Sequence, residues 1–291
     1  MQGAIVKSFT YNNLGGNRAG VIILDKQIET QEKQSIAAKI GLSETAFIKQ
    51  IDETNYDISF FTPVCEVDLC GHATIAAFYY LGVIGMIKGD TEVKTVYQNT
   101  KVGKLEIKIE FKNHIVDYVM MQQATPQIFK ELKGESKKNI AKSLNIDEDN
   151  IGLMDFQIEP TIVSTGLKDI IIPVKTRAIL NDIKANNSMI TNISLKNDVV
   201  GYHVYTIDKT QIYTRNFAPL VGINEECATG TSNGALGSLL FKKRILKGDI
   251  QIIQGESMNE PSLIFVNVSQ QNDRLDVRVG GKALVIENII S

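Results

Sequence analysis

Two stretches of the chain share one arrangement: residues 61–74 read FTPVCEVDLCGHAT, and residues 217–231 read FAPLVGINEECATGT. Each begins with Phe-x-Pro, passes an acidic residue and a cysteine, and ends in small residues that open an apolar, helix-like run. The spacing from proline to cysteine differs by one residue between Pro63–Cys70 and Pro219–Cys227. This internal repeat predicts two related domains, which we place at residues 1–115 and 116–291. The last strand of the chain is able to cross back from the second domain to the first.

Around the repeat, strand-like and helix-like segments alternate, which indicates a mixed α and β fold. Residues 104–111 (KLEIKIEF) alternate between apolar and polar side chains, as in a half-buried strand. Residues 30–40 favour a helix that Thr30 caps and Gly41 ends. Further strands are predicted at residues 4–9, 20–24, 45–49, 56–61, 117–122, 161–164, 199–206, 211–217, 262–268 and 274–279, and further helices near 72–82, 136–144, 174–185 and 231–245.

Composition excludes several classes of function. The 291 residues are 43% hydrophobic, and 31 basic against 33 acidic residues give a net charge of −2, so charge favours neither nucleic acid nor an anionic membrane as a partner. The N-terminal sequence lacks the pattern of a signal peptide, and no apolar run approaches the roughly 18 residues of a membrane helix. Three cysteines, Cys65, Cys70 and Cys227, do not form a disulfide framework. We therefore expect reduced thiols and a cytoplasmic location.

The small residues at the two expected helix starts suit the binding of an anion. The first turn of a helix has unpaired N–H groups and a positive dipole end. Gly71, Ala73, Ala228 and Gly230 would let a ligand come close to these groups. Two such starts facing each other would hold a carboxylate and stabilise the charge left when a proton leaves the neighbouring carbon, each donor lowering the barrier by roughly 3–4 kcal/mol. This chemistry needs no cofactor.

Three side chains are candidates to carry the proton. Glu44 lies between a helix stop and an apolar strand, where burial would raise its pKa toward that of a useful base. The alternative is a solvated turn residue or a cap. His72 at a helix start is suited to shuttling a proton near neutral pH, or else only hydrogen-bonds the turn. Glu226 has the same ambiguity, because an acid near a helix start is stabilising by itself.

Cys70 and Cys227 allow a second chemistry. A thiol at a helix start has a lowered pKa, and two thiols on opposite sides of one carbon would racemise or epimerise it. The alternative is two small residues buried beneath the helices. A metal site at Cys65, Cys70 and His72 is not expected, because the spacing gives at most three ligands with awkward geometry. Residues 15–20 (GGNRAG) lack the spacing of a dinucleotide-binding loop.

Taken together, the motifs resemble those of the PhzF (phenazine-biosynthesis-like) family, which shares the diaminopimelate-epimerase fold. The resemblance extends over nearly the whole chain. It includes Gly16-Asn17 before an apolar strand, with Arg18 where the family has proline, and Ser43-Glu44-Thr45. It also includes the two repeated stretches, Arg215-Asn216 before the second of them, Gln254-Gly255, and residues 277–281 (VRVGG).

The resemblance implies an α+β fold of two similar domains, each a curled, mostly antiparallel sheet around a central helix, with the site in the cleft between them. It also implies a homodimer without cofactor. By position, Glu44 matches the family's general acid/base, and His72, Glu226 and Thr231 match residues that contact substrate and relay protons. We count as substrate-binding Asn17, Gly71, Ala73, Thr229, Gly230 and Thr231.

The chain departs from the family at three positions, where Glu226, Cys227 and Thr231 replace aspartate, proline and serine. The longer Glu226 leaves the details of the proton relay open. Related racemases carry a Cys-Gly motif in each half, and this chain has Cys70-Gly71 and Cys227-Ala228. The sequence thus combines the thiols of a racemase with the glutamate and histidine of an isomerase.

Three functions follow as hypotheses. The first is a cofactor-independent isomerase that shifts a proton next to the carboxylate of a small metabolite. The second is an amino-acid racemase or epimerase that uses Cys70 and Cys227. The third is a non-catalytic protein that binds small carboxylates.

Overall fold

The computed structural model describes residues 2–272 and 274–290. The chain forms two compact units: one comprises the chain up to Gln122 together with the stretch from Gly280 onward, and the other comprises Gln123–Val279. The chain first passes from one unit to the other after Gln122, which is later than the predicted domain boundary after residue 115. The C-terminal strand belongs with the first unit.

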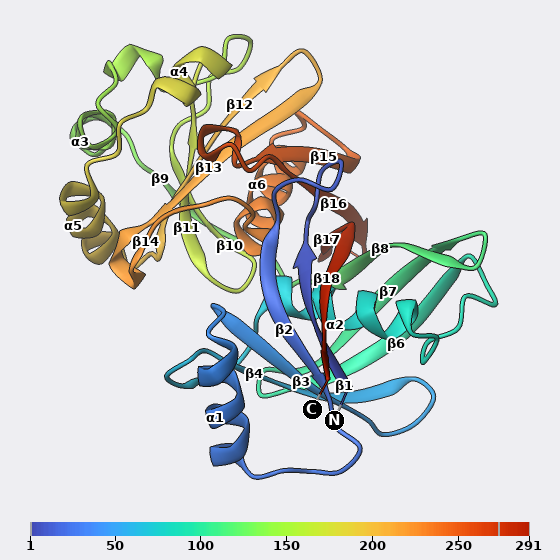
Figure 1. Cartoon of the computed structure of the whole chain (residues 1–291). Helices are drawn as coiled ribbons and strands as arrows, with labels where there is room; N and C mark the ends of the chain where they lie inside the picture. Colours follow the sequence, from blue (N-terminus) through green and yellow to red (C-terminus); the bar gives the residue numbers. More distant parts are fainter. Residues whose placement is uncertain (1, 273, 291) are drawn as a thin grey trace. The chain divides into compact units, whose positions relative to one another are not determined.

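In the first unit, two helices accompany a set of strands that Figure 1 shows in blue to green, with the last strand in red. These elements are β1 (Gln2–Ser8), β2 (Asn17–Ile23), α1 (Thr30–Ile40), β3 (Glu44–Gln50), β4 (Asn55–Phe61), β5 (Glu66–Val67), α2 (Gly71–Val83), β6 (Val93–Thr100), β7 (Gly103–Lys112), β8 (Ile115–Gln122) and β18 (Ala283–Ile290).

The second unit carries the remaining helices and strands. They are β9 (Gln127–Glu131), α3 (Glu135–Leu144), β10 (Thr161–Ser164), β11 (Lys168–Pro173), α4 (Arg177–Asp182), α5 (Asn187–Asn197), β12 (Gly201–Asp208), β13 (Gln211–Ala218), β14 (Ile223–Glu226), α6 (Gly230–Lys242), β15 (Gly248–Gln254), β16 (Ser262–Gln271) and β17 (Arg274–Gly281), whose last two residues belong to the first unit, with short 3₁₀ turns at Glu148–Asn150, Pro219–Val221 and Glu256–Met258.

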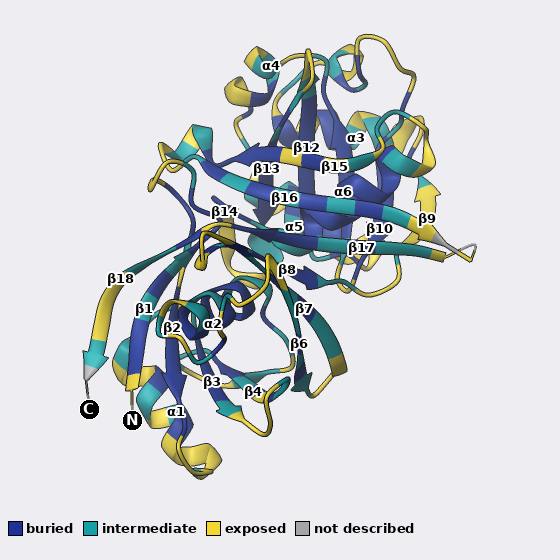
Figure 2. Cartoon of the chain, turned by 90° about the vertical axis from the view of Figure 1, so that its right-hand side faces the viewer, coloured by how far each residue is buried: buried dark blue, intermediate teal, exposed yellow. Residues whose placement is uncertain are grey.

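The sheet of the first unit curls around α2 because this helix is apolar on every side. Strand β1 pairs antiparallel with β18 and β2, β2 runs parallel to β3, β3 pairs antiparallel with β4, and β4 runs parallel to β6. Strands β6, β7 and β8 continue antiparallel. Residues 73–78 of α2 are all buried, and the helix contacts β1, β2, β3, β7, β8 and β18 (Figure 2).

The second unit repeats this order of pairing around α6. Strands β10 and β11 are antiparallel, β11 and β12 parallel, and β12 and β13 antiparallel. Strand β13 then pairs with β14 and runs parallel to β15, which pairs antiparallel with β16. The internal repeat in the sequence therefore corresponds to a repeated topology, and the predicted fold class is confirmed.

Glycines in α6 let the strands approach this central helix closely. An added Cβ at Gly234 would lie 2.9 Å from a side-chain atom of Val279, and one at Gly237 would lie 2.7 Å from Val266. The next turn is equally packed, since Leu236 and Leu240 are fully buried. The start of α6 is therefore held in place by packing along the whole helix.

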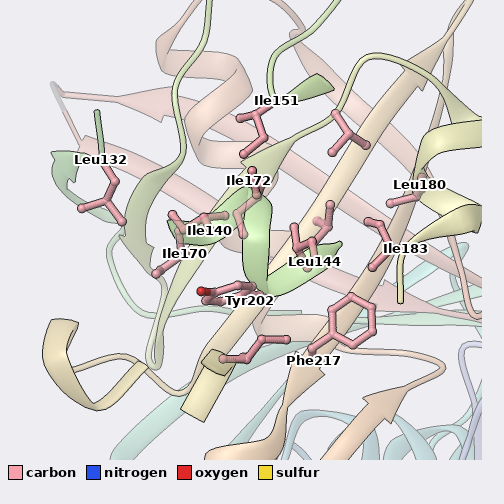
Figure 3. Close-up of a cluster of buried hydrophobic side chains, with 14 of the residues drawn as sticks. Leu132, Ile140, Leu144, Ile151, Ile170, Ile172, Leu180, Ile183, Tyr202 and Phe217 are labelled. Atoms are coloured by element: carbon pink, nitrogen blue, oxygen red, sulfur yellow. The ribbon is translucent and has the colours of Figure 1, made fainter. Parts of the chain in front are cut away.

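A separate apolar cluster joins the outer helices of the second unit to its sheet (Figure 3). Ile140 and Leu144 of α3 meet Ile170 and Ile172 of β11 and Tyr202 of β12, all of them nearly or fully buried. This layer fixes the strands whose other face carries α6.

Most predicted elements form within a few residues of their expected bounds. The helix at residues 30–40 does end at Gly41, which has a φ of 69°, but Glu29 rather than Thr30 is its N-cap. The helix expected at 174–185 is limited to α4. The pattern did not predict β5, β6, β9, β11, α5, β14, β15 and β18.

Among residues 2–272 and 274–290, no helix is long and apolar enough to cross a membrane.

Replacing Leu144 by alanine should lower the free energy of unfolding by about 2–5 kcal/mol, because its side chain is fully buried in the apolar cluster. The matched change Leu195→Ala in α5 should cost less than about 0.5 kcal/mol, since Leu195 is 61% exposed. Urea unfolding of both variants measures the difference. Equal losses would show that the cluster is not the core of this layer.

Candidate active site

Glu44 is brought to one end of the first unit's sheet by the stop of α1. Gly41 ends that helix in the left-handed region, and the chain enters β3 at Glu44. Strands β2 and β3 are parallel, with Ala19 opposite Glu44, and β2 begins at Asn17. Asn17 and Glu44 therefore lie at the same end of the sheet.

The start of α2 is tied to that same end. Ser8, the last residue of β1, pairs with Asn17 and donates a hydrogen bond of 2.7 Å from its hydroxyl to the carbonyl oxygen of His72. His72 is the second residue of α2, between Gly71 and Ala73. The predicted residues Asn17, Glu44 and the first turn of α2 are thus gathered in one place by the fold.

Glu44 and His72 form the central contact of this site. His72 Nε2 lies 3.1 Å from Glu44 Oε2, and the two side chains are only 12% and 22% exposed. Glu44 Oε2 is buried and has no well-aligned hydrogen-bond donor within the described part of the chain, so the contact is an ion pair rather than a linear hydrogen bond.

The pKa values of this pair are shifted in a way that keeps both groups charged. Burial alone would raise the pKa of Glu44, but the adjacent His72 lowers it below its usual value. Burial alone would lower the pKa of His72, but Cys70 and Glu44 raise it well above its usual value. The expectation that Glu44 has a raised pKa was therefore wrong, because the sequence did not reveal the cation beside it.

Cys70 completes this cluster as the N-cap of α2. It is buried, and its Sγ lies 3.5 Å from His72 Nδ1 and 3.9 Å from Nε2. Glu44, Cys70 and His72 place donor atoms for a metal within 4.8 Å of one another. Cys65 is not part of the cluster: it is exposed, and its N–H donates to the Thr62 hydroxyl in a turn.

In the second unit, the side chains and backbone N–H groups at the start of α6 are fixed by hydrogen bonds among themselves. Glu226 ends β14, and the hydroxyl of Thr229, the N-cap residue of α6, donates to its carboxylate. The N–H of Thr229 donates to Gln254 Oε1 at 3.2 Å. With Thr229 engaged in this way, the first helical N–H groups of α6 are those of Gly230 and Thr231.

Gln254, the last residue of β15, fastens this turn with all four bonds that a side-chain amide can make. Its Oε1 accepts from Thr229 and from Asn233 Nδ2 at 2.8 Å. Its Nε2 donates to the Glu226 carbonyl at 2.7 Å and to the Thr229 hydroxyl at 3.0 Å. The amide is fully buried, so the turn from Glu226 to Asn233 has a single bonding pattern.

A buried polar network continues behind Gln254. Asn233 Oδ1 lies 3.0 Å from His203 Nε2, and Asn216 Nδ2 lies 3.2 Å from both His203 Nδ1 and the Ser232 hydroxyl, which donates to Asp169. Burial lowers the pKa of His203 to about 4, and burial raises that of Asp169 to about 6. His203 is thus a neutral link between two amides, not a proton carrier near neutral pH.

Cys227 occupies a different position from Cys70. Thr229, not Cys227, is the N-cap of α6, so the two cysteines are not equivalent in the repeated topology. Cys227 is buried, and burial, together with Glu260 and Glu226, raises the pKa of its thiol to about 12. An added Cβ at Gly255 would lie 2.9 Å from the Cβ of Cys227. The expectation that a thiol at this place has a lowered pKa is therefore wrong for Cys227.

Several residues of the second cluster were missed by sequence reasoning. Gln254 and Asn216 belong to motifs of the family resemblance, but no local pattern indicated their contacts. The other residues lie on separate strands or inside the helix and meet only through the fold: Asp169, His203, Ser232 and Asn233.

Comparison with known proteins covers nearly the whole chain. The model of the PhzC-PhzF family, described as phenazine biosynthesis-like protein, matches residues 6–288. An uncharacterized isomerase of Clostridium acetobutylicum is 33% identical over 97% of this chain and 94% of its own, and the uncharacterized isomerase YddE of Escherichia coli K12 is 32% identical over 97% and 95%.

The crystal structure of a PhzF-family phenazine biosynthesis protein from Bacillus anthracis has a TM-score of 0.84 and 25% identity, and the match covers 99% of this chain and 98% of that one. The names of these relatives confirm the expected class of enzyme, an isomerase. The family match extends over both units and both clusters. The chain therefore belongs to the PhzC-PhzF family of phenazine biosynthesis-like proteins.

Proposed function

We propose that this protein is a cofactor-independent isomerase that moves a proton between carbons next to the carboxylate of a small metabolite, with Glu44 as the catalytic base. One observation carries the proposal: the half-buried Glu44 lies 3.1 Å from His72 at the first turn of α2. The neighbouring His72 lowers the pKa of Glu44, so the carboxylate is ionised near neutral pH and its buried Oε2 is free of a proton of its own.

The reaction then proceeds in two proton transfers. Glu44 takes a proton from a carbon of the substrate, and the electron pair left behind spreads onto the substrate carboxylate. The N–H groups of Gly71 and Ala73 and the charge of His72 stabilise that anion. Glu44 returns the proton to a different carbon, so the enzyme ends in the charge state in which it began.

We also propose a role for residues at the start of α6, in the second unit. Gly230 and Thr231 offer N–H groups of a second helix start, and Glu226 is fixed by Thr229. We propose that they contact the substrate, as the family resemblance implies, and that Asn17 does so in the first unit. Homodimer assembly and a cytoplasmic location, in line with three free thiols, are part of the same proposal.

Glu44→Gln should reduce exchange of substrate carbon-bound hydrogen with D2O by roughly 10²–10⁴-fold, because the amide cannot accept the proton. A panel of amino, hydroxy and unsaturated carboxylic acids, followed by NMR, provides the assay. Glu53→Gln, at an exposed carboxylate of the same unit, is the matched control and should leave exchange unchanged. Full exchange in Glu44→Gln would remove Glu44 as the base, and no exchange anywhere in the panel would favour a carboxylate-binding protein.

Cys227→Ser and Cys227→Ala should both retain most of the exchange activity, because a buried thiol with a pKa of about 12 remains protonated. Each variant should lose only about 1 kcal/mol of stability. The racemase alternative expects the reverse, with either cysteine essential. Loss of exchange in a Cys227 variant that unfolds at the wild-type temperature would therefore contradict the proposal.

A further inference from the structure

The cluster of Glu44, Cys70 and His72 has the spacing of a metal site. His72 Nε2 lies 3.1 Å from Glu44 Oε2 and 3.9 Å from Cys70 Sγ, and the three donor atoms lie within 4.8 Å of one another. Ligands bonded to a tetrahedral zinc ion at about 2.0–2.3 Å lie about 3.3–3.7 Å apart. Small rotations of the side chains, without movement of β3 or α2, would bring all three donors around one cation.

The donor types select the kind of cation. A thiolate and an imidazole favour zinc-like ions over magnesium or calcium, and one carboxylate is a common third ligand. We propose that Glu44, Cys70 and His72 bind a thiophilic divalent cation of the Zn²⁺ class. Three protein ligands leave the fourth position open to water. The bound ion acts as an inhibitor, not as a cofactor.

The ion inhibits because it binds the carboxylate that acts as the base. This consequence rests on the proposed function. A cation on Glu44 Oε2 occupies the oxygen that accepts the substrate proton. The positive end of α2 opposes a cation at this place, and the ion must displace the proton of His72. The site is therefore reversible and weaker than a structural zinc site.

Titration of the metal-free protein with Co²⁺ tests the site without any substrate. We expect one Co²⁺ per chain, with a thiolate-to-cobalt absorption band that Zn²⁺ abolishes. Cys70→Ser should remove the band, whereas Cys65→Ser, at the exposed cysteine, should keep it. His72→Gln should weaken binding at least roughly 10- to 100-fold, and His114→Gln, at an exposed histidine, should not change it.

Thermal unfolding of each variant separates loss of the site from loss of the fold. A Co²⁺ complex without the thiolate band, or a band that survives Cys70→Ser and disappears with Cys65→Ser, would overturn the assignment. Because Co²⁺ binding needs no turnover, this result is independent of the exchange assay with Glu44→Gln. Inhibition of exchange by Zn²⁺ that a chelator reverses would then link the two.

Discussion

The contact between Glu44 and His72 is the interaction on which the active site depends. Burial opposes the charge of each group; His72 lowers the pKa of Glu44, and Cys70 together with Glu44 raises the pKa of His72. Removing either partner would leave a buried charge without its counterion, which is costly. The sheet end that carries Asn17 and Glu44 and the bond from Ser8 to the His72 carbonyl hold the two groups in place.

The second helix start is built on a different principle. In the network around Gln254, neutral amides and a neutral histidine fix the turn through hydrogen bonds. The repeated topology therefore carries two unlike clusters: an ion pair with a thiol in one unit and an amide network in the other. This difference explains why Cys227, despite its place in the repeat, resembles a packing residue more than a nucleophile.

The sequence predicted the fold class and the location of the first cluster, because Gly41 and the small residues Gly71 and Ala73 act through local rules for helix ends. It failed where distant residues meet. The pKa of Glu44 was predicted in the wrong direction because His72 reaches it only after the sheet has curled around α2. The network of Gln254 and His203 was not predicted, because buried polar residues on separate strands show no periodicity.

The charge of His72 in the free enzyme is the most direct test of this account. The chain has only three histidines, so nitrogen NMR of the metal-free protein near neutral pH resolves the signals of each ring. A His72 variant identifies which of these signals belong to His72. The account predicts that both ring nitrogens of His72 carry protons in the wild type and that Glu44→Gln lowers the pKa of the ring. A neutral His72 beside an intact Glu44 would contradict it.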